Sequence, residues 1–415
     1  MRMHRQNLII ALTLWMAAVA SSGMAENAAA RPAPQILVSD LRIGQRGEHT
    51  RFVLNISDKV DFEVFTLADP YRIVIDFPEV AWRLEPGAVQ GPTGLIKGFR
   101  FGLYRPGRSR MVIDMTGPTV IANKFLLPPD GERGYRLVLD LKPTDRIGYL
   151  ATAGWPKGAA EPTSPADEPP VEDFSDKPAN AKRVVVIDPG HGGVDPGATG
   201  VDGTYEKDLV LPLGKALRDA LERTGKYTVV MTRDTDIFLS LKARVAVARR
   251  SKADLFVSLH ADSAPDSFVR GASVYTLSEK ASDKEAEALA KAENQSDVIA
   301  GVDLTNESDV VTSILIDLAQ RETKNNAVKF AQNLVPELQR AGDVTQKSHR
   351  FAGFRVLKAP DVPSVLIEVG YVSNRLDESV MGTNRWRRVM TTAISRAIDR
   401  YFRESRLDHK PQAGQ

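Results

Sequence analysis

Four side chains that can bind a metal ion or move a proton lie beside apolar runs. His191 follows the β-branched run 184–187 across a turn rich in glycine and proline, and His260 ends a second apolar run. Glu206 precedes a leucine-striped segment, and Glu368 closes a third apolar run, where an unpaired carboxylate would be costly. Two imidazoles and one carboxylate, with water in the fourth position, form a catalytic zinc site. A further carboxylate beside such a site can take a proton from the water and pass it to a leaving amine.

Each of these residues also has an ordinary structural interpretation when it is taken alone. His191 could be a simple loop histidine, Glu206 a first-turn carboxylate that interacts with a helix dipole, and Glu368 one half of a buried salt bridge. The chain contains no cysteine, which excludes disulfides, thiolate catalysis and Cys-ligated zinc. Any metal must therefore be held by histidine and carboxylate, but the residue types alone leave both interpretations open.

The elements that must position these side chains follow a strand–helix alternation from residue 182 to residue 404. The strand-like runs are 184–188, 227–232, 255–259, 272–277 and 365–368, and the amphipathic segments include 209–223, 240–251 and 384–402. This alternation predicts an α/β domain with a mostly parallel twisted sheet flanked by helices. Ligands of such sheets bind beyond the carboxyl ends of the strands, which is where both histidines are expected.

Residues 35–145 predict a small all-β sandwich domain ahead of the α/β domain. Three hexapeptides, 72–77, 110–115 and 136–141, share the pattern Arg, three apolar residues, Asp and one more apolar residue. Turn signals separate the short strand candidates, as in β-sandwiches. No histidine cluster or carboxylate pair stands out here, so we expect binding rather than chemistry. The sequence also interleaves arginines with aromatic residues, as either a solvated strand face or a surface for an anionic polymer: Phe99, Arg100, Phe101, Tyr104, Arg105, Arg108 and Arg110.

The segments outside the two predicted domains indicate export of the protein and a spacer between the domains. Basic residues, the apolar run 8–20 and a small-residue stretch predict a secretory signal peptide over 1–25; an uncleaved membrane anchor is the alternative. No adjacent arginine pair precedes the apolar run, which favours the general secretory route. We therefore expect a periplasmic location without a stable membrane span. Residues 146–181 predict a Pro/Ala/acidic linker, and 405–415 a tail. The net charge of +2 gives no general reason to expect nucleic acid as a partner.

Four segments around the candidate site resemble a known enzyme family. VVIDPGHGG (185–193), YEKD (205–208), SLHAD (258–262) and VLIEVGYVSN (365–374) are similar to the signature blocks of the zinc-dependent N-acetylmuramoyl-L-alanine amidases of the Amidase_3 family. The resemblance covers nearly all of 182–404. It implies that His191, Glu206 and His260 hold one zinc ion and that Glu368 is the catalytic carboxylate. The implied substrate is the peptidoglycan amide between N-acetylmuramic acid and L-alanine. Residues 35–145 resemble the AMIN domain, which implies binding to peptidoglycan or to the division septum.

The stretch 279–320 interrupts the α/β pattern. Residues 282–285 form a capping-box pattern, and the Ala- and Glu-rich run that follows predicts a short helix. Similarity to division-associated amidases implies an autoinhibitory helix here, with one glutamate on the open zinc position until an activator with a LytM-like domain displaces it. The candidates are Glu285, Glu287 and Glu293, of which Glu293, nearest the helix end, is preferred. The alternative is a solvated surface helix followed by a core helix.

A second helix is expected to begin near Ser308. It carries four apolar residues at helical spacing, Val311, Ile314, Leu315 and Leu318. They could form a docking stripe for the activator, and core packing explains them nearly as well. Two other functions remain open for the whole chain: a different zinc-dependent wall hydrolase, such as a peptidase or deacetylase, and a non-catalytic wall-binding regulator.

Overall fold

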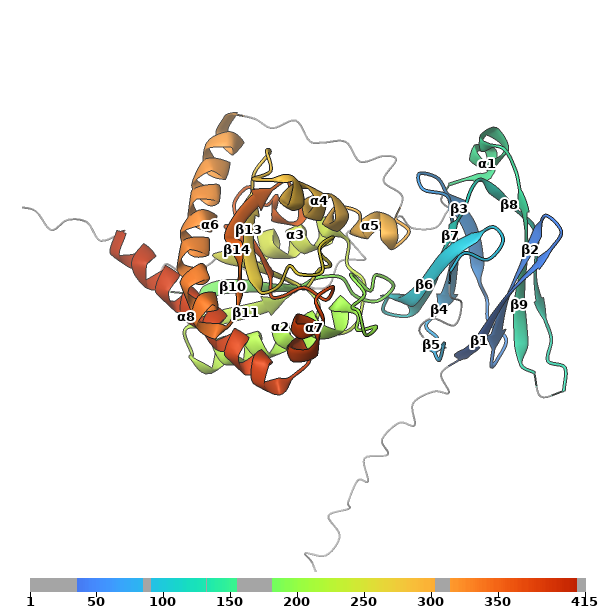
Figure 1. The fold of residues 1–415 in the computed structure, drawn as a ribbon, viewed down its shortest axis with the longest axis horizontal. Coiled ribbons are helices and arrows are strands. Elements are labelled where there is room, and N and C mark those ends of the chain that lie inside the picture. The colour runs from blue at the N-terminus through green and yellow to red at the C-terminus, as the bar shows by residue number, and fades with distance from the viewer. Residues whose placement is uncertain (1–35, 85–90, 132, 155–180, 303–313, 409–415) are drawn as a thin grey trace, which may run out of the picture. The chain divides into compact units, whose positions relative to one another are not determined.

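Two β-sheets build the N-terminal domain (Figure 1). The computed structural model describes residues 36–84, 91–131, 133–154, 181–302 and 314–408. The predicted signal peptide, Val311 and most of the predicted linker lie outside these ranges. One sheet has the order β5-β1-β2-β9-β8 and the other β3-β4-β7-β6. Their strands are β1 (Leu37–Arg46), β2 (His49–Ile56), β3 (Glu63–Leu67), β4 (Arg72–Pro78), β5 (Ala81–Trp82), β6 (Ile96–Arg105), β7 (Arg108–Met115), β8 (Thr119–Leu127) and β9 (Tyr135–Pro143).

The two sheets share one apolar core, as expected for a sandwich. Alternate residues of the central strands enter it, among them Phe52 and Leu54 of β2 and Ile73 and Ile75 of β4. The three Arg-to-Asp hexapeptides lie in β4, β7 and β9, so the strand prediction is confirmed there. A short helix, α1 (Arg146–Thr152), follows within the range that the sequence assigns to the linker, and its buried Tyr149 hydroxyl donates to the Leu67 carbonyl at 2.8 Å.

A six-stranded mixed sheet forms the centre of the α/β domain. Its order is β11-β10-β12-β15-β13-β14, and only the β13–β15 pairing is antiparallel. The strands are β10 (Arg183–Pro189), β11 (Tyr227–Met231), β12 (Leu255–His260), β13 (Ala272–Leu277), β14 (Val344–Ala352) and β15 (Ser364–Glu368). The predicted mostly parallel α/β architecture is therefore confirmed.

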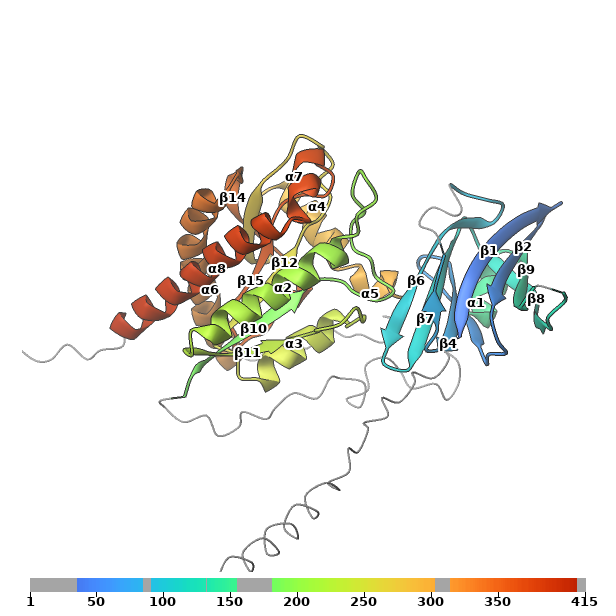
Figure 2. The same cartoon turned by 90° about the horizontal axis from the view of Figure 1, so that it is seen from below.

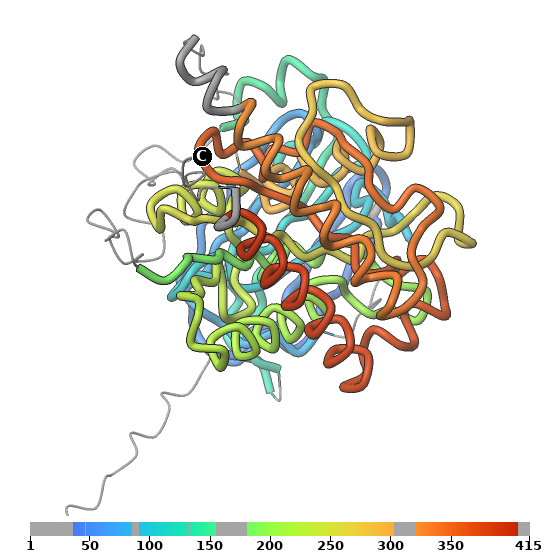
Figure 3. Tube along the Cα trace, turned by 90° about the vertical axis from the view of Figure 1, so that its left-hand side faces the viewer, coloured from blue at the N-terminus to red at the C-terminus, as the bar shows by residue number. Residues whose placement is uncertain are grey.

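Helices cover both faces of this sheet because its strands are apolar on both sides. Val185 and Ile187 of β10 pack against α2 (Glu206–Arg223), α6 (Ile314–Ala341) and α8 (Asn384–Asp408). Val184 and Val186, which alternate with them, pack with α3 (Leu241–Arg250), α4 (Lys284–Glu293) and the 3₁₀ turn η2 (Arg355–Leu357). Figures 2 and 3 show α8 beside α2 and α6. No helix among the described residues is long and apolar enough to cross a membrane.

The stretch after β13 contains two helices that bear on the site. Helix α4 forms where the Ala- and Glu-rich run predicts it, and α5 (Ser296–Ile299) follows at once. The capping-box prediction places Ser282 at the N-cap and is wrong by one residue. Asp283 holds that position instead and accepts from the Ala286 amide at 2.9 Å. Ser308 lies outside the described residues, and α6 runs unbroken from Ile314 to Ala341.

Candidate metal centre

Parallel strands bring the predicted ligands together at one edge of the sheet. His191 lies in the turn after β10, His260 is the last residue of β12, and Glu206 is the first residue of α2. β10 and β12 are parallel neighbours, so residues that follow them leave the sheet on the same side. Glu293, the last residue of α4, joins the three. One ligand atom from each of these four buried residues can be chosen so that all lie within 4.8 Å of one another.

The separations among these atoms are short enough for one metal ion to contact all four residues. His191 Nε2 lies 3.2 Å from Glu206 Oε2 and 3.6 Å from Glu293 Oε1. His260 Nδ1 lies 3.1 Å from Glu206 Oε1 and 3.2 Å from Glu293 Oε2. Zinc bonds of about 2.0–2.1 Å at tetrahedral angles place neighbouring ligands roughly 3.3–3.4 Å apart. The cluster therefore has ligand types and separations that could hold a metal ion.

A buried carboxylate orients His191. Its Nδ1 lies 2.9 Å from Asp195 Oδ2, and Asp195 is itself fully buried. The other ring nitrogen, Nε2, is buried and forms no well-aligned hydrogen bond among the described residues, although Glu206 Oε2 lies 3.2 Å away. A carboxylate–histidine pair that leaves the second nitrogen unpartnered is the usual arrangement behind a zinc ligand. Without a bound ion, His191 Nε2 would be a buried polar atom without a well-aligned hydrogen bond, which is rare in protein interiors.

A second buried network supports His260. Its Nε2 lies 3.2 Å from Ser258 Oγ, and that hydroxyl donates to Asp188 Oδ2 at 2.7 Å. Asp188 also accepts from Thr232 Oγ1 at 2.6 Å and from Arg244 Nη1 at 2.8 Å. Burial alone would raise the pKa of Asp188, but the Arg244 charge and these hydrogen bonds hold it below its ordinary value. This series of hydrogen bonds, from Arg244 through Asp188 to Ser258, holds the His260 ring so that Nδ1 faces the other candidate ligands.

Glycine is required at two points where backbone approaches the ligands. A Cβ on Gly190 would lie 2.4 Å from His260 Cε1. A Cβ on Gly197 would lie 2.6 Å from both Glu206 Oε2 and His191 Cδ2, and the φ of +69° there also favours glycine. The glycine-rich turn singled out in the sequence thus makes room for the site.

The charges of the site favour a cation. Burial would lower the pKa of His191, but Glu206, Asp195 and Glu293 outweigh it and raise that pKa well above the ordinary value. Burial likewise opposes ionisation of Glu206, and His191 and His260 instead hold its pKa well below the usual range. Several carboxylates thus converge on two imidazoles. A divalent cation at this position would compensate the negative charge of these carboxylates, as protons on both imidazole rings would.

Glu368, the predicted catalytic carboxylate, lies at the strand end next to His260. It ends β15 directly opposite His260 in the parallel pairing of β12 and β15. Its Oε2 accepts from the Asp262 amide at 2.9 Å, whereas Oε1 is buried without a hydrogen-bond partner in the structure. Burial, reinforced by the charges of Asp262, Glu206 and Glu293, raises the pKa of Glu368 well above its ordinary value. A carboxyl in this environment is suited to both accepting and returning a proton.

Comparison with known proteins places this geometry in a family. Residues 185–400 match the family model described as N-acetylmuramoyl-L-alanine amidase, and residues 40–141 match the AMIN domain. The chain belongs to the N-acetylmuramoyl-L-alanine amidases. The amidase is 33% identical over 375 residues to amidase AmiC of Escherichia coli, covering 87% of this chain and 88% of that protein. It is 34% identical over 388 residues to AmiC of Neisseria meningitidis, covering 90% and 92%. The family resemblance predicted from the four segments is confirmed.

Solved structures of relatives match the catalytic half of this amidase. AmiC2 of Nostoc punctiforme is 29% identical, with a TM-score of 0.40, and the match covers 54% of this chain and 98% of that one. The catalytic domain of CwlV from Paenibacillus polymyxa is 28% identical, with a TM-score of 0.38, and the match covers 53% and 98%.

The three candidate glutamates of α4 have different surroundings in this amidase. Glu293 is buried beside both histidines, as described above. Glu285 instead accepts from Arg350 Nη1 at 2.6 Å, and Glu287 is exposed on the helix surface. The proposed activator-docking residues stay a prediction, because Val311 lies outside the described residues and the side chains of Ile314, Leu315 and Leu318 are not described.

Two carboxylates were not assigned a role from the sequence. Asp195 orients His191, and its position four residues after the histidine was the available signal. Asp262 lies beside Glu368, and burial together with the charges of Glu293 and Glu206 raises its pKa to about 8. Both lie in segments that the sequence singled out, but their contacts depend on how the chain folds.

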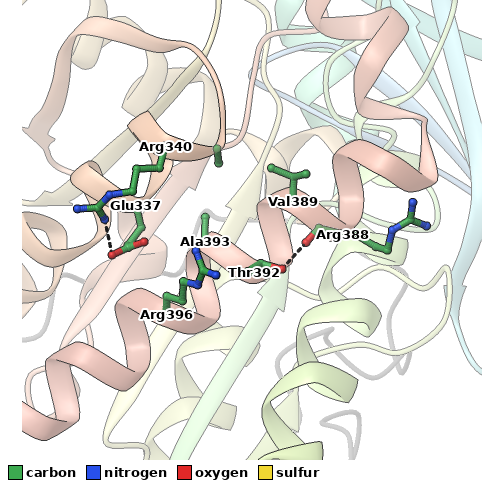
Figure 4. A pocket seen from close by; sticks show the side chains of 8 residues that line it. Glu337, Arg340, Arg388, Val389, Thr392, Ala393 and Arg396 are labelled. Carbon is green, nitrogen blue, oxygen red and sulfur yellow. Dashed lines mark hydrogen bonds and ion pairs between the residues drawn. The ribbon is translucent and has the colours of Figure 1, made fainter.

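A surface hollow between α6 and α8 lies apart from this chemistry (Figure 4). Arg340, Arg388 and Arg396 line it, with one carboxylate, Glu337, which accepts from Arg340 and from Arg400. None of the residues that line the hollow belongs to the candidate metal centre.

Proposed function

We propose that this amidase hydrolyses the amide bond between N-acetylmuramic acid and L-alanine in peptidoglycan. His191, Glu206 and His260 would hold one zinc ion, and Glu368 would be the catalytic carboxylate. The observation that carries the proposal is the convergence of four buried ligand atoms within 4.8 Å, one of them an imidazole nitrogen that forms no well-aligned hydrogen bond among the described residues. The register that sets Glu368 beside His260 at the strand ends supports a role for Glu368 in proton transfer.

The reaction uses these side chains in sequence. When bound, zinc supplies Lewis acidity toward the scissile carbonyl and a lowered pKa of water. Glu368 accepts a proton from the attacking water as its oxygen adds to the lactyl carbonyl carbon. The same carboxyl then donates that proton to the alanine nitrogen, so that the C–N bond breaks into a free carboxylate and a free amine. Asp195 holds His191 in a fixed orientation throughout.

The same geometry supports an autoinhibited resting state. A catalytic zinc site keeps one position open, but here the Glu293 carboxylate lies against both histidines. A carboxylate in that position excludes the hydrolytic water. Helix α4 would therefore act as a lid until a partner with a LytM-type domain displaces it. Export by the general secretory route to the periplasm, recruitment to the septum by the AMIN domain and a role in daughter-cell separation complete the proposal.

Metal content and reaction products together test this function. Purified mature protein should contain one zinc ion per chain, and digested sacculi should yield free muramic lactyl carboxyl and free L-alanine amine. A peptidase or a deacetylase would release different groups. Glu368→Gln should retain zinc and lose digestion, whereas His191→Ala should lose zinc. Undiminished digestion by Glu368→Gln would remove that residue from the catalytic role.

A further inference from the structure

The segment that follows Glu293 ties the lid to the catalytic domain. Residues 36–415 form one compact unit, and the first two residues of α5, Ser296 and Asp297, are buried within it. Ser296 Oγ donates to Asp195 Oδ2 at 2.5 Å, and Asp297 Oδ1 accepts from the Leu241 amide at 2.9 Å. These bonds anchor the chain three and four residues beyond the inhibitory carboxylate. The position of Glu293 therefore depends on where α5 is held.

Three arginines of the AMIN domain bind the same segment. Four consecutive carbonyl groups, at the end of α5 and in the turn after it, accept hydrogen bonds from guanidinium groups. Val298 accepts from Arg72, Ile299 from Arg100 at 2.5 Å, and Ala300 and Gly301 from Arg110 at 3.2 and 3.1 Å. The last carbonyls of a helix have no partner within the helix, so an external donor is needed when they are buried. The arginines supply it.

Contacts within the AMIN domain fix the orientation of Arg110 and Arg100 toward residues 298–301. Arg110 is fully buried and forms a two-bond ion pair with Asp76, at 2.6 and 2.8 Å. Its guanidinium carbon lies 3.6 Å from the centre of the Tyr104 ring. Arg100 is paired with Asp114 in the same sheet. A guanidinium fixed by a carboxylate and an aromatic ring loses little freedom on binding, as suits a preformed recognition surface.

Apolar contacts surround these hydrogen bonds. Val74 and Val112 alternate with the sandwich-core residues of β4 and β7 and so lie on the outer face of the sheet, yet both are fully buried. Tyr104 stacks on Phe238 of the catalytic domain with ring centres 5.7 Å apart. One cluster joins residues of both domains: Phe65, Leu67, Val74, Tyr104, Val112, Val194, Phe238, Ala300 and Val302. The solvated strand face considered from the sequence is therefore wrong for Arg110.

We propose that the outer face of the β3-β4-β7-β6 sheet is an interaction surface for residues 298–301 of this same chain, and that docking there holds Glu293 on the metal centre. In this arrangement the AMIN domain binds residues 298–301, and the catalytic domain binds Ser296 and Asp297. Together the two sets of contacts keep α4 over the metal centre. This inference rests on the proposed autoinhibition by Glu293. It adds a regulatory contact to a domain expected only to bind the cell wall.

Substitution of two arginines in the full-length mature chain tests the surface from the AMIN side. Arg72→Ala/Arg100→Ala should raise basal digestion of sacculi about tenfold or more, the equivalent of one or more lost charge-assisted hydrogen bonds. Amide hydrogen exchange in 294–302 should become faster at the same time. Arg51→Ala is the matched control, because Arg51 pairs with Asp140 in the other sheet and is largely exposed. It should change neither quantity.

A substitution in the segment tests the same contact without touching the AMIN fold. Ala300 is fully buried in the shared cluster, so Ala300→Arg should push the segment off the sheet. Ala288→Arg is its control, since Ala288 is exposed on α4. The proposal is supported if Ala300→Arg shows faster amide exchange in 294–302 and higher basal digestion while the Ala288→Arg control shows neither. Unchanged exchange and unchanged digestion in both interface variants would overturn it.

A third background separates the inference from the function on which it rests. In a Glu293→Ala chain the arginine substitutions should add less digestion than they add to the parent chain, because the carboxylate that occupies the metal centre is already gone. If Glu293→Ala itself leaves basal digestion unchanged, the autoinhibition fails, and the exchange data still decide whether the segment docks. If Glu293→Ala raises digestion but neither interface variant does, only the role of the AMIN contact is refuted.

Discussion

Removal of the Glu293 carboxylate is the most direct perturbation of the closed site. Its two oxygens lie 3.2 Å from His260 Nδ1 and 3.6 Å from His191 Nε2. Glu293→Ala deletes both contacts and leaves the three proposed zinc ligands of the open enzyme in place. The variant should therefore keep its metal, and a larger fraction of molecules should accept substrate.

The contact geometry sets the expected size of this effect. A hydrogen bond to a charged group contributes about 1.5–3 kcal/mol. Because about 1.36 kcal/mol corresponds to a tenfold change, the open fraction and the basal rate should rise roughly 10- to 150-fold. Helix α4 retains the burial of Ala286, Leu289 and Ala290, so it stays folded and partly covers the site. We therefore expect a rise toward the lower end of this range.

The assay is release of soluble label from dye-labelled sacculi by purified protein with zinc in excess. Glu287→Ala is the matched control, because Glu287 lies on the same helix but is exposed. It should digest at the basal rate. A Glu293→Ala protein that holds zinc and is folded, yet digests no faster than this control, would refute the argument that Glu293 blocks the centre.

Three further predictions concern the support of the site. Arg244→Ala should lower the free energy of unfolding in urea by about 3–5 kcal/mol, because it leaves a buried carboxylate without its partner, whereas Arg249→Ala, in an exposed pair, should cost less than about 1 kcal/mol. Gly190→Ala should weaken zinc binding in a competition titration, because the new methyl group meets an imidazole at 2.4 Å, and Gly98→Ala, which has open space, should not. In metal-free protein the pKa of Asp262 is raised to about 8, so the folded state binds more protons than the unfolded state between about pH 4 and pH 8 and loses stability as pH rises. Asp262→Asn should make that decline shallower in urea unfolding at pH 5 and pH 7.5, and an identical slope would contradict the assignment.

Much of the catalytic site could be inferred from short stretches of sequence. His191, His260 and Glu368 each lie at the end of a continuous apolar run, and parallel strands share an edge, so their proximity follows from local pattern and fold class. The amphipathic segments also formed helices where their spacing placed them. Such features depend on periodicities of a few residues.

Other features depend on contacts between residues far apart in the chain. Glu285, Glu287 and Glu293 are chemically alike, and only the packing of α4 brings the last of them to the histidines. The single-residue error at the N-cap of α4 has a similar origin, since Ser282 and Asp283 can both cap a helix. The role of Arg110 was likewise hidden, because an Arg-to-Asp strand pattern is the same whether the outer face meets water or another segment.

The sequence by itself determined the ligand types, the absence of thiol chemistry, the strand–helix alternation and the family. Only the tertiary structure decided which glutamate closes the metal centre and what the arginines of the AMIN sheet bind. The physical reason is that ligand chemistry and periodicity are local properties of the chain. The burial of one particular carboxylate, or of one face of a sheet, is instead fixed by partners from other parts of the chain. Glu293 meets His191 and His260 of two other segments, and Arg110 meets the carbonyls of Ala300 and Gly301, 190 and 191 residues along the chain.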